Sequence, residues 1–206
     1  MPDSLTLADA GLPGIRQMYG HYKQAFPEAE RKPYDRLAAL VRGGKYRILL
    51  ARDTARDKVV GYAFVYHDDA TAWLDYLEVL PEFRSGGYGA RLFSALIDGL
   101  GPGQDGLYLE VDRPQPGETD SSDAVRRIRF YERLGTRRLQ VNYELPTAEG
   151  ACPMYLYFKP KPGAGLPSRA AWLRSVEAVF QYVHSDISAA AAILARLTWL
   201  ADGEGT

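Results

Sequence analysis

The sequence is poor in residues that form covalent or metal cross-links. It has one cysteine, Cys152, so an intramolecular disulfide is excluded. Cys152 lies beside a proline and has no basic neighbour, which favours a structural role over that of a nucleophile. The three histidines, His21, His67 and His184, are far apart and lack the spacing of metal ligands. We therefore expect no metal.

The chain also lacks an excess of charge and a long apolar run. Its 25 basic residues nearly balance its 26 acidic ones, so neither a nucleic-acid nor a membrane partner is expected. No apolar stretch approaches the roughly 20 residues of a membrane-spanning helix. The first residues do not show the basic and then apolar pattern of a signal peptide. These absences predict a cytoplasmic protein.

What the sequence does have is a succession of strand and helix patterns. Strands are expected at 4–8, 46–52, 59–66, 72–79, 107–111, 137–141 and 153–159, and helices at 11–26, 33–41, 87–100 and 122–134. A loop or a broken hairpin is expected between the last two strands. In the strand at 72–79, alternation puts Asp75 and Leu77 on one face and Tyr76 and Glu78 on the other.

A linker rich in proline and glycine follows at 160–167. Two helices are expected after it, at 168–184 and 186–201, and each has an apolar stripe that must pack on something. The partner could be the main domain, the other helix or a second subunit. We thus expect one domain over residues 1–160 and a helical extension over 161–206, which could support a homodimer.

A glycine-rich turn joins the strand at 72–79 to the next helix. It comprises Arg84, Ser85, Gly86, Gly87, Tyr88 and Gly89, with Ala90 following. Glycine lets a backbone approach a ligand closely, and the start of a helix offers unpaired N–H groups and a positive dipole end. The turn is therefore a candidate phosphate site.

Three glycine-rich patterns can be compared with this turn. A P-loop needs lysine and then serine or threonine after its last glycine, but alanine and arginine follow Gly89. A dinucleotide-binding fingerprint needs a third glycine where Leu92 stands. The pattern [RQ]-x-x-G-x-[GA] fits every fixed position. With Val79 and Pro81 ahead of it, the turn resembles motif A of the GNAT acyl-CoA N-acyltransferases.

This resemblance covers residues 4–160 and implies an α/β (α+β) fold. Its central sheet would be mixed, mostly antiparallel and splayed between the fourth and fifth strands, with flanking helices and an added C-terminal helical hairpin. The cosubstrate would be acetyl-CoA. The main chain at Leu77 and Val79 would pair with the pantetheine arm, and Ser85, Gly86, Gly87, Tyr88, Gly89 and Ala90 would hold the pyrophosphate, with Arg84 adding charge.

A second stretch, Phe130-Tyr131-Glu132-Arg133-Leu134-Gly135, resembles the F-Y-x-x-x-G of GNAT motif B. The resemblance implies that Tyr131 serves the departing thiolate, and a phenol with a pKa of about 10 can donate to it. Tyr131 could instead be a core residue. The family often has an asparagine where this chain has Ala124, so that contact to the pantetheine arm must be absent or supplied elsewhere.

Deprotonation of an acceptor amine calls for a base, for which Glu110 and Glu78 are the candidates. Leu109-Glu110-Val111 resembles the L-E-V of the ribosomal-protein alanine N-acetyltransferases, in which the glutamate is taken as the base. In the family, the strands that carry these two positions splay apart, so both carboxylates could face one cleft. Either could instead be a solvated or salt-bridged strand residue.

The sequence thus predicts an N-acetyltransferase that moves an acetyl group from acetyl-CoA to a primary amine by direct attack. The alternative is a non-catalytic coenzyme-A-binding sensor or a partner-binding module. The first two helices and their connection would line the acceptor pocket. The acceptor itself stays open among small molecules such as a polyamine, an amino acid or an antibiotic, and peptide amines such as a protein N-terminus or a lysine.

Overall fold

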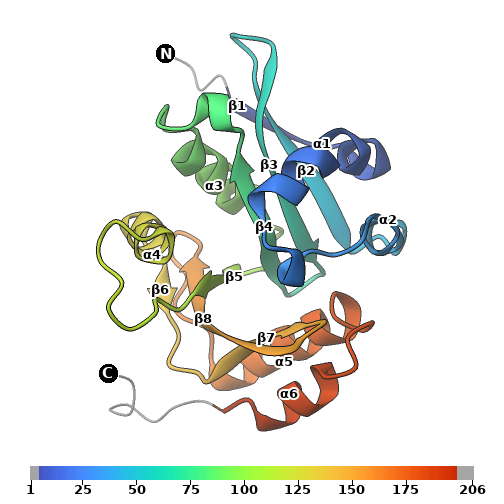
Figure 1. Ribbon diagram of the computed structural model, residues 1–206, viewed down its shortest axis with the longest axis vertical. Helices are drawn as coiled ribbons and strands as arrows, with labels where there is room; N and C mark the ends of the chain where they lie inside the picture. The colour runs from blue at the N-terminus through green and yellow to red at the C-terminus, as the bar shows by residue number, and fades with distance from the viewer. Residues whose placement is uncertain (1–4, 199–206) are drawn as a thin grey trace. The chain divides into compact units, whose positions relative to one another are not determined.

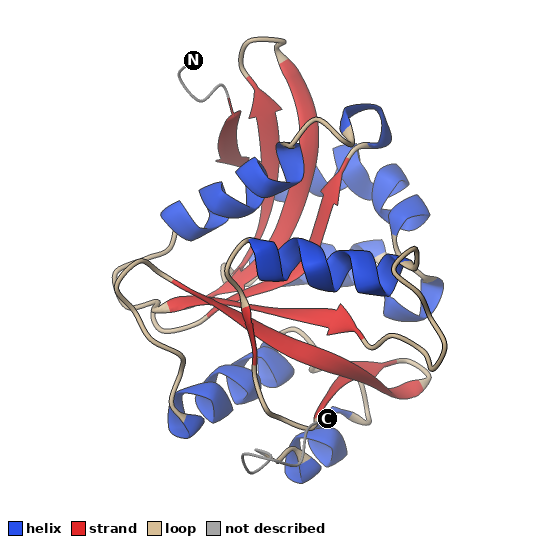
Figure 2. Ribbon diagram, turned by 90° about the vertical axis from the view of Figure 1, so that its left-hand side faces the viewer, coloured by secondary structure: helices blue, strands red, loops and turns tan. Residues whose placement is uncertain are grey.

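The computed structural model describes residues 5–198, which form two compact units that meet in sequence between Gln104 and Asp105 (Figure 1). Each unit is built around a sheet with helices packed on it, as the colouring by secondary structure makes visible (Figure 2). Within the described residues, no helix is both long and apolar enough to cross a membrane. No group of three or more potential metal ligands occurs there either.

The first unit contains four consecutive antiparallel strands. They are β1 (Leu5–Asp9), β2 (Tyr46–Asp53), β3 (Lys58–His67) and β4 (Ala72–Val79), and each pairs with the next. Helices α1 (Gly11–Ala25) and α2 (Tyr34–Arg42) cover one face of this sheet, and α3 (Tyr88–Asp98) covers the other (Figure 1). Two short 3-10 turns, η1 (Glu28–Glu30) and η2 (Pro81–Phe83), complete the unit.

Strand β4 is irregular at Asp75. Phe64 pairs with Tyr76 and Val65 pairs with Leu74, so Asp75 is an extra residue that has no partner in the ladder. Such a bulge changes the direction of the side chains beyond it. The simple alternation expected for this strand is therefore wrong at Asp75, whose carboxylate reaches the same lysine as the Tyr76 hydroxyl.

The second unit has β8 (Gly150–Pro160) as its central strand. On one side β8 pairs antiparallel with β5 (Gly106–Asp112), and on the other with β6 (Arg137–Arg138) and β7 (Tyr143–Thr147). Helix α4 (Asp123–Arg133) covers one face of this sheet, whereas α5 (Arg169–Tyr182) lies on the other, with α6 (Ala190–Arg196) beside it (Figure 1).

The faces of β5 follow from its pairing with β8. Tyr157 lies opposite Leu109 and donates a hydrogen bond to Glu132 of α4 over 3.2 Å, so α4 covers the Leu109 face. Tyr108 contacts Phe158, directly opposite it, on the other face, and its hydroxyl bonds to Ser175 of α5. Tyr108 and Glu110 therefore lie on the face that α5 covers.

Most of the expected elements are present, with differences in the second unit. The strand expected at 137–141 ends at Arg138, because the Val141 N–H turns back to the Leu139 carbonyl. The segment before β8 contains β7, which forms a regular hairpin with β8.

The last helix begins at Ala190 instead of residue 186, because two successive three-residue turns close at Ile187 and Ala190. It ends at Arg196, where the chain becomes extended. The expected positions 4 and 199–201 lie outside the described residues.

Helix α5 supplies core residues to the second unit. Trp172, Val176 and Val179 are fully buried, whereas Leu166, in the linker, is 55% exposed. The apolar stripe expected for this helix is thus covered within the same unit. The boundary expected at residue 160 stays a prediction.

Replacing Trp172 by alanine should cost about 3–5 kcal/mol in the free energy of unfolding, because it leaves a large cavity. The matched change Leu166→Ala should alter it by less than about 0.5 kcal/mol. Urea unfolding followed by circular dichroism measures both values. Equal effects of the two substitutions would show that α5 does not contribute to a packed core.

Candidate active site

The turn after β4 has a backbone shaped for close approach. Ser85 has a φ of 64° and Gly87 a φ of 76°. A positive φ is uncommon for a residue that has a Cβ, and Ser85 is such a residue. Gly87 occupies the N-cap of α3, and no side chain caps the helix. The first N–H groups of α3 are thus not bound by a capping side chain and can donate to an anion.

Arg84, at the start of this turn, is bound to the end of β4. Its Nη2 lies 3.2 Å from Glu78 Oε1, and its Nε donates to the Val79 carbonyl over 3.2 Å. Tyr62 of β3 donates to Glu78 Oε2 over 2.5 Å, and burial together with this carboxylate raises the pKa of Tyr62. Glu78 is buried, so its charge is held between a phenol and a guanidinium.

The side chain of Tyr88 ties the first turn of α3 to the end of β2. Its hydroxyl donates to Asp53, and Arg56 binds both groups, with its Nη1 3.0 Å from Asp53 Oδ2. The hydrogen bond from Tyr88 is the largest cause that lowers the pKa of Asp53 to about 2. Sequence reasoning placed Tyr88 in the turn but gave no signal for Asp53, which lies 35 residues earlier.

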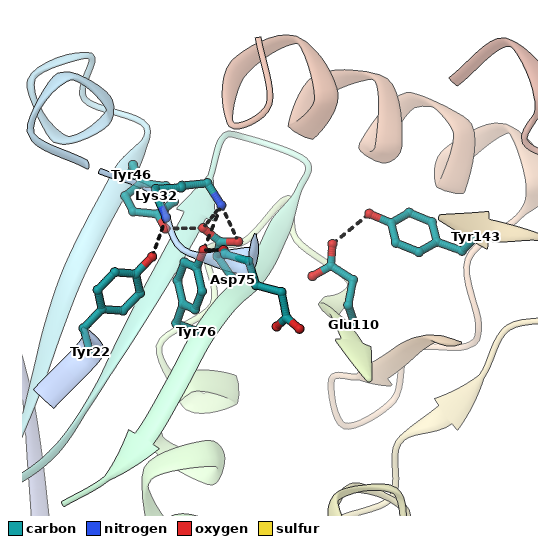
Figure 3. Close-up of polar contacts among 8 residues, drawn as sticks. Tyr22, Lys32, Tyr46, Asp75, Tyr76, Glu110 and Tyr143 are labelled. Atoms are coloured by element: carbon teal, nitrogen blue, oxygen red, sulfur yellow. Dashed lines mark hydrogen bonds and ion pairs between the residues drawn. The ribbon is translucent and has the colours of Figure 1, made fainter. Parts of the chain in front are cut away.

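A polar cluster on the α1 side of the first sheet went unnoticed in the sequence (Figure 3). Lys32 Nζ lies 3.0 and 2.8 Å from the two Asp75 oxygens and 3.3 Å from the Tyr76 hydroxyl. Tyr46 also donates to Asp75, and Tyr22 accepts from the Lys32 N–H over 2.6 Å. These bonds fasten the connection between α1 and α2, the expected acceptor wall, to β4.

In the second unit, Glu110 lies on β5 and accepts a hydrogen bond from Tyr143 of β7. The distance from the Tyr143 hydroxyl to Glu110 Oε1 is 2.7 Å (Figure 3). Tyr143 is fully buried, whereas Glu110 is half-buried. The carboxylate thus has a fixed orientation and remains partly accessible. Nothing in the local sequence identified Tyr143 as its partner.

Tyr131 lies on α4, on the other side of β5 from the α5 face. It is half-buried, and burial raises the pKa of its hydroxyl from 10.0 to about 12. The nearby Arg127 Nη1 is 2.6 Å from Asp112 at the end of β5, which fixes α4 to that strand. Glu110 therefore lies on one face of β5, and α4, which carries Tyr131, covers the other face.

The predicted residues gather in two groups. Glu78 and Arg84 are joined directly in the first unit, whereas Glu110 and Tyr131 belong to the second. The expectation that Glu78 and Glu110 share one cleft concerns residues of different units and stays a prediction. The assignment of residues 77–90 to coenzyme A likewise stays a prediction.

The model of the acetyltransferase (GNAT) family matches residues 15–136, which is more than half of the chain. The chain therefore belongs to the GNAT acetyltransferase family. This confirms the family and the α/β fold class that the sequence predicted. No curated protein matches the sequence significantly.

Solved structures agree with this fold. A Bacteroides thetaiotaomicron protein assigned to the GNAT family matches with a TM-score of 0.71 and 22% identity, covering 86% of this chain and 97% of that one. Arabidopsis thaliana NAA60 in complex with acetyl-CoA matches with a TM-score of 0.57 and 16% identity, over 77% and 99% of the two chains. The ribosomal-protein-S18-alanine N-acetyltransferase of Escherichia coli gives 0.53 and 24%, over 80% and 97%.

The Tyr88–Asp53 hydrogen bond predicts a dependence of stability on pH. Asp53 has an ordinary pKa of 3.8 when unfolded and about 2 when folded, so its contribution is complete above pH 5 and is lost as the pH falls through this range. In Tyr88→Phe the folded pKa should return toward 3.8. The free energy of unfolding, measured in urea between pH 5 and pH 2, should then fall less steeply than in the unchanged protein. Parallel curves would contradict the assigned bond.

Proposed function

We propose that this protein is an N-acetyltransferase that transfers the acetyl group of acetyl-CoA to a primary amine without a covalent enzyme intermediate. The observation that carries the proposal is the turn at 84–90, with left-handed Ser85 and Gly87 and an α3 N-terminus that no side chain caps. A helix N-terminus whose N–H groups are not capped is well suited to bind phosphate oxygens. Family membership supplies the chemistry that such a site would serve.

In this proposal the N–H groups of residues 85–90 hold the pyrophosphate. Leu77 and Val79 offer main-chain groups to the pantetheine amides, as an added strand would. Arg84 adds positive charge near the phosphates, although its bonds to Glu78 and the Val79 carbonyl limit its reach. The ligand therefore contacts mainly uncharged main-chain N–H groups, whose orientation is fixed by the turn before the ligand binds.

Glu110 is the proposed base. Its carboxylate is partly accessible and is bound by a neutral phenol, so it can accept a proton from the incoming ammonium directly or through water. Glu78 remains the alternative, but it is buried and its two carboxylate oxygens are already bound by Arg84 and Tyr62. We assign Glu78 the role of orienting Arg84.

Tyr131 is the proposed donor to the leaving sulfur. Once Glu110 has taken the first proton, the amine nitrogen attacks the thioester carbonyl carbon and the C–S bond breaks. A phenol with a pKa of about 12 is a weaker acid than a thiol, whose pKa is about 8.5. Tyr131 therefore stabilises the thiolate by a hydrogen bond, and the second proton released from nitrogen completes the coenzyme A thiol.

Binding tests the turn directly. Calorimetry should show that acetyl-CoA and dephospho-coenzyme A bind far more tightly than pantetheine, which lacks the pyrophosphate. Gly87→Val should weaken binding of both nucleotides about tenfold or more, because a side chain there costs about 1–2 kcal/mol at positive φ. Gly163→Val is the control, since Gly163 has a φ of 84° in the linker. Equal weakening by both variants would sink the assignment of the turn.

Turnover tests the catalytic residues. Release of coenzyme A thiol with a panel of primary amines should fall about 10²–10⁴-fold in Glu110→Gln, as expected on removal of a general base. It should fall about tenfold or more in Tyr131→Phe, which loses a hydrogen bond to the charged thiolate. The Kd for acetyl-CoA should not change. Because the pKa of Tyr131 is raised to about 12, no loss of rate from its ionisation should occur up to about pH 10. Tight binding without turnover of any amine would instead favour the sensor.

A further inference from the structure

The C-terminal extension contacts a short stretch at the start of β7, residues 142–144. Three consecutive residues of this stretch each bind a different part of the extension. The Asn142 N–H donates to the Thr198 carbonyl over 2.9 Å, and Glu144 Oε2 lies 2.6 Å from Arg196 Nε. Between them, the Tyr143 ring packs edge-on against Phe180 of α5, with 6.2 Å between the ring centroids.

The middle residue of this stretch is the one that reaches the proposed base. Tyr143 lies opposite Met154 on β8, and Glu110 lies opposite Leu156, two residues further along the same face. The Tyr143 hydroxyl spans β8 on that face and donates to Glu110 Oε1. Strand β7, on the far side of β8 from β5, thus orients the carboxylate on the face that α5 covers.

The hydrogen bond from Tyr143 does more than provide a partner for a buried hydroxyl. Tyr143 is fully buried, and its hydroxyl donates to a half-buried carboxylate on the strand that carries the proposed chemistry. A donor to one oxygen restricts the rotation of the carboxylate. It also stabilises the charged form, which is the form able to accept a proton.

We propose that Tyr143 is a positioning residue for Glu110, and that the C-terminal extension holds Tyr143 in place through Phe180, Thr198 and Arg196. This inference rests on the proposed function. It gives residues 169–198 a task in catalysis. The extension acts through β7 and makes no contact with the reacting atoms in this scheme.

The test compares Tyr143→Phe with Tyr108→Phe. Both remove one buried hydroxyl from the same face of the same sheet, but the Tyr108 hydroxyl bonds to Ser175 and not to the base. Tyr143→Phe should lower kcat about tenfold or more, the usual effect of losing a hydrogen bond to a charged group. The KM for acetyl-CoA should stay unchanged. The difference in kcat between Tyr143→Phe and the unchanged protein should become smaller as the pH rises. Tyr108→Phe should keep the original kcat.

The extension is tested by Phe180→Leu and, at the partly exposed ion pair, by Arg196→Gln. Each should lower kcat less than Tyr143→Phe and in the same pH-dependent manner, with the KM for acetyl-CoA unchanged. If both variants keep the original kcat while Tyr143→Phe loses it, the part of the proposal that concerns the extension is wrong. If Tyr143→Phe itself matches Tyr108→Phe, the whole proposal is overturned.

A measurement that needs no turnover separates this inference from the proposed function. The Glu110 carboxyl can be titrated by carbon-13 NMR in glutamate-labelled protein, with Glu110→Gln identifying its signal. Its titration should move to higher pH in Tyr143→Phe and not in Tyr108→Phe. An unchanged titration overturns the positioning role even if acetyl transfer is found. A shifted titration in a chain that acetylates no amine supports the positioning role and overturns the proposed function alone.

Discussion

The turn between β4 and α3 can present N–H groups to a ligand only if those groups are not consumed by the protein itself. Gly87 meets this requirement because it ends the turn in a left-handed conformation and has no side chain that could cap the helix. A loop of this kind needs outside support. Tyr88 supplies it through Asp53 on one side, and Arg84 supplies it through Glu78 on the other. The Tyr88–Asp53 and Arg84–Glu78 contacts therefore hold this stretch of backbone in place.

Tyrosine hydroxyls also bind the charged groups that are buried in this protein. Lys32 and Asp75 are both largely shielded from water, and an isolated charge in such a place would be costly. Each is tolerated because tyrosines complete its hydrogen bonding. Phenols serve again at Glu78 and Glu110, where they bind a carboxylate without neutralising it. Tyr46, Tyr62 and Tyr143 thus act alike, each as an uncharged donor to a carboxylate.

Local signals predicted most elements and the turn, because strand alternation, helical spacing and glycine placement depend on near neighbours in sequence. They failed where the pairing register of the strands decides which face a side chain lies on and which residues it contacts. Asp75 changes face because of a bulge against Phe64, and no alternation pattern contains that bulge. Tyr143 was missed because its pairing with Glu110 arises through β8, which joins segments 33 residues apart. The last helix was overextended because its apolar stripe continues past the point where Thr198 pairs with Asn142.

The segments that hold Tyr143 lie beyond residue 136, where the match to the family model ends. The glycine-rich turn and Tyr131 lie within the matched residues, whereas Tyr143 and the residues that contact it from the extension lie after them. In the proposed scheme, a change in the tail of the chain would alter how firmly Glu110 is held and would leave the glycine-rich turn unchanged.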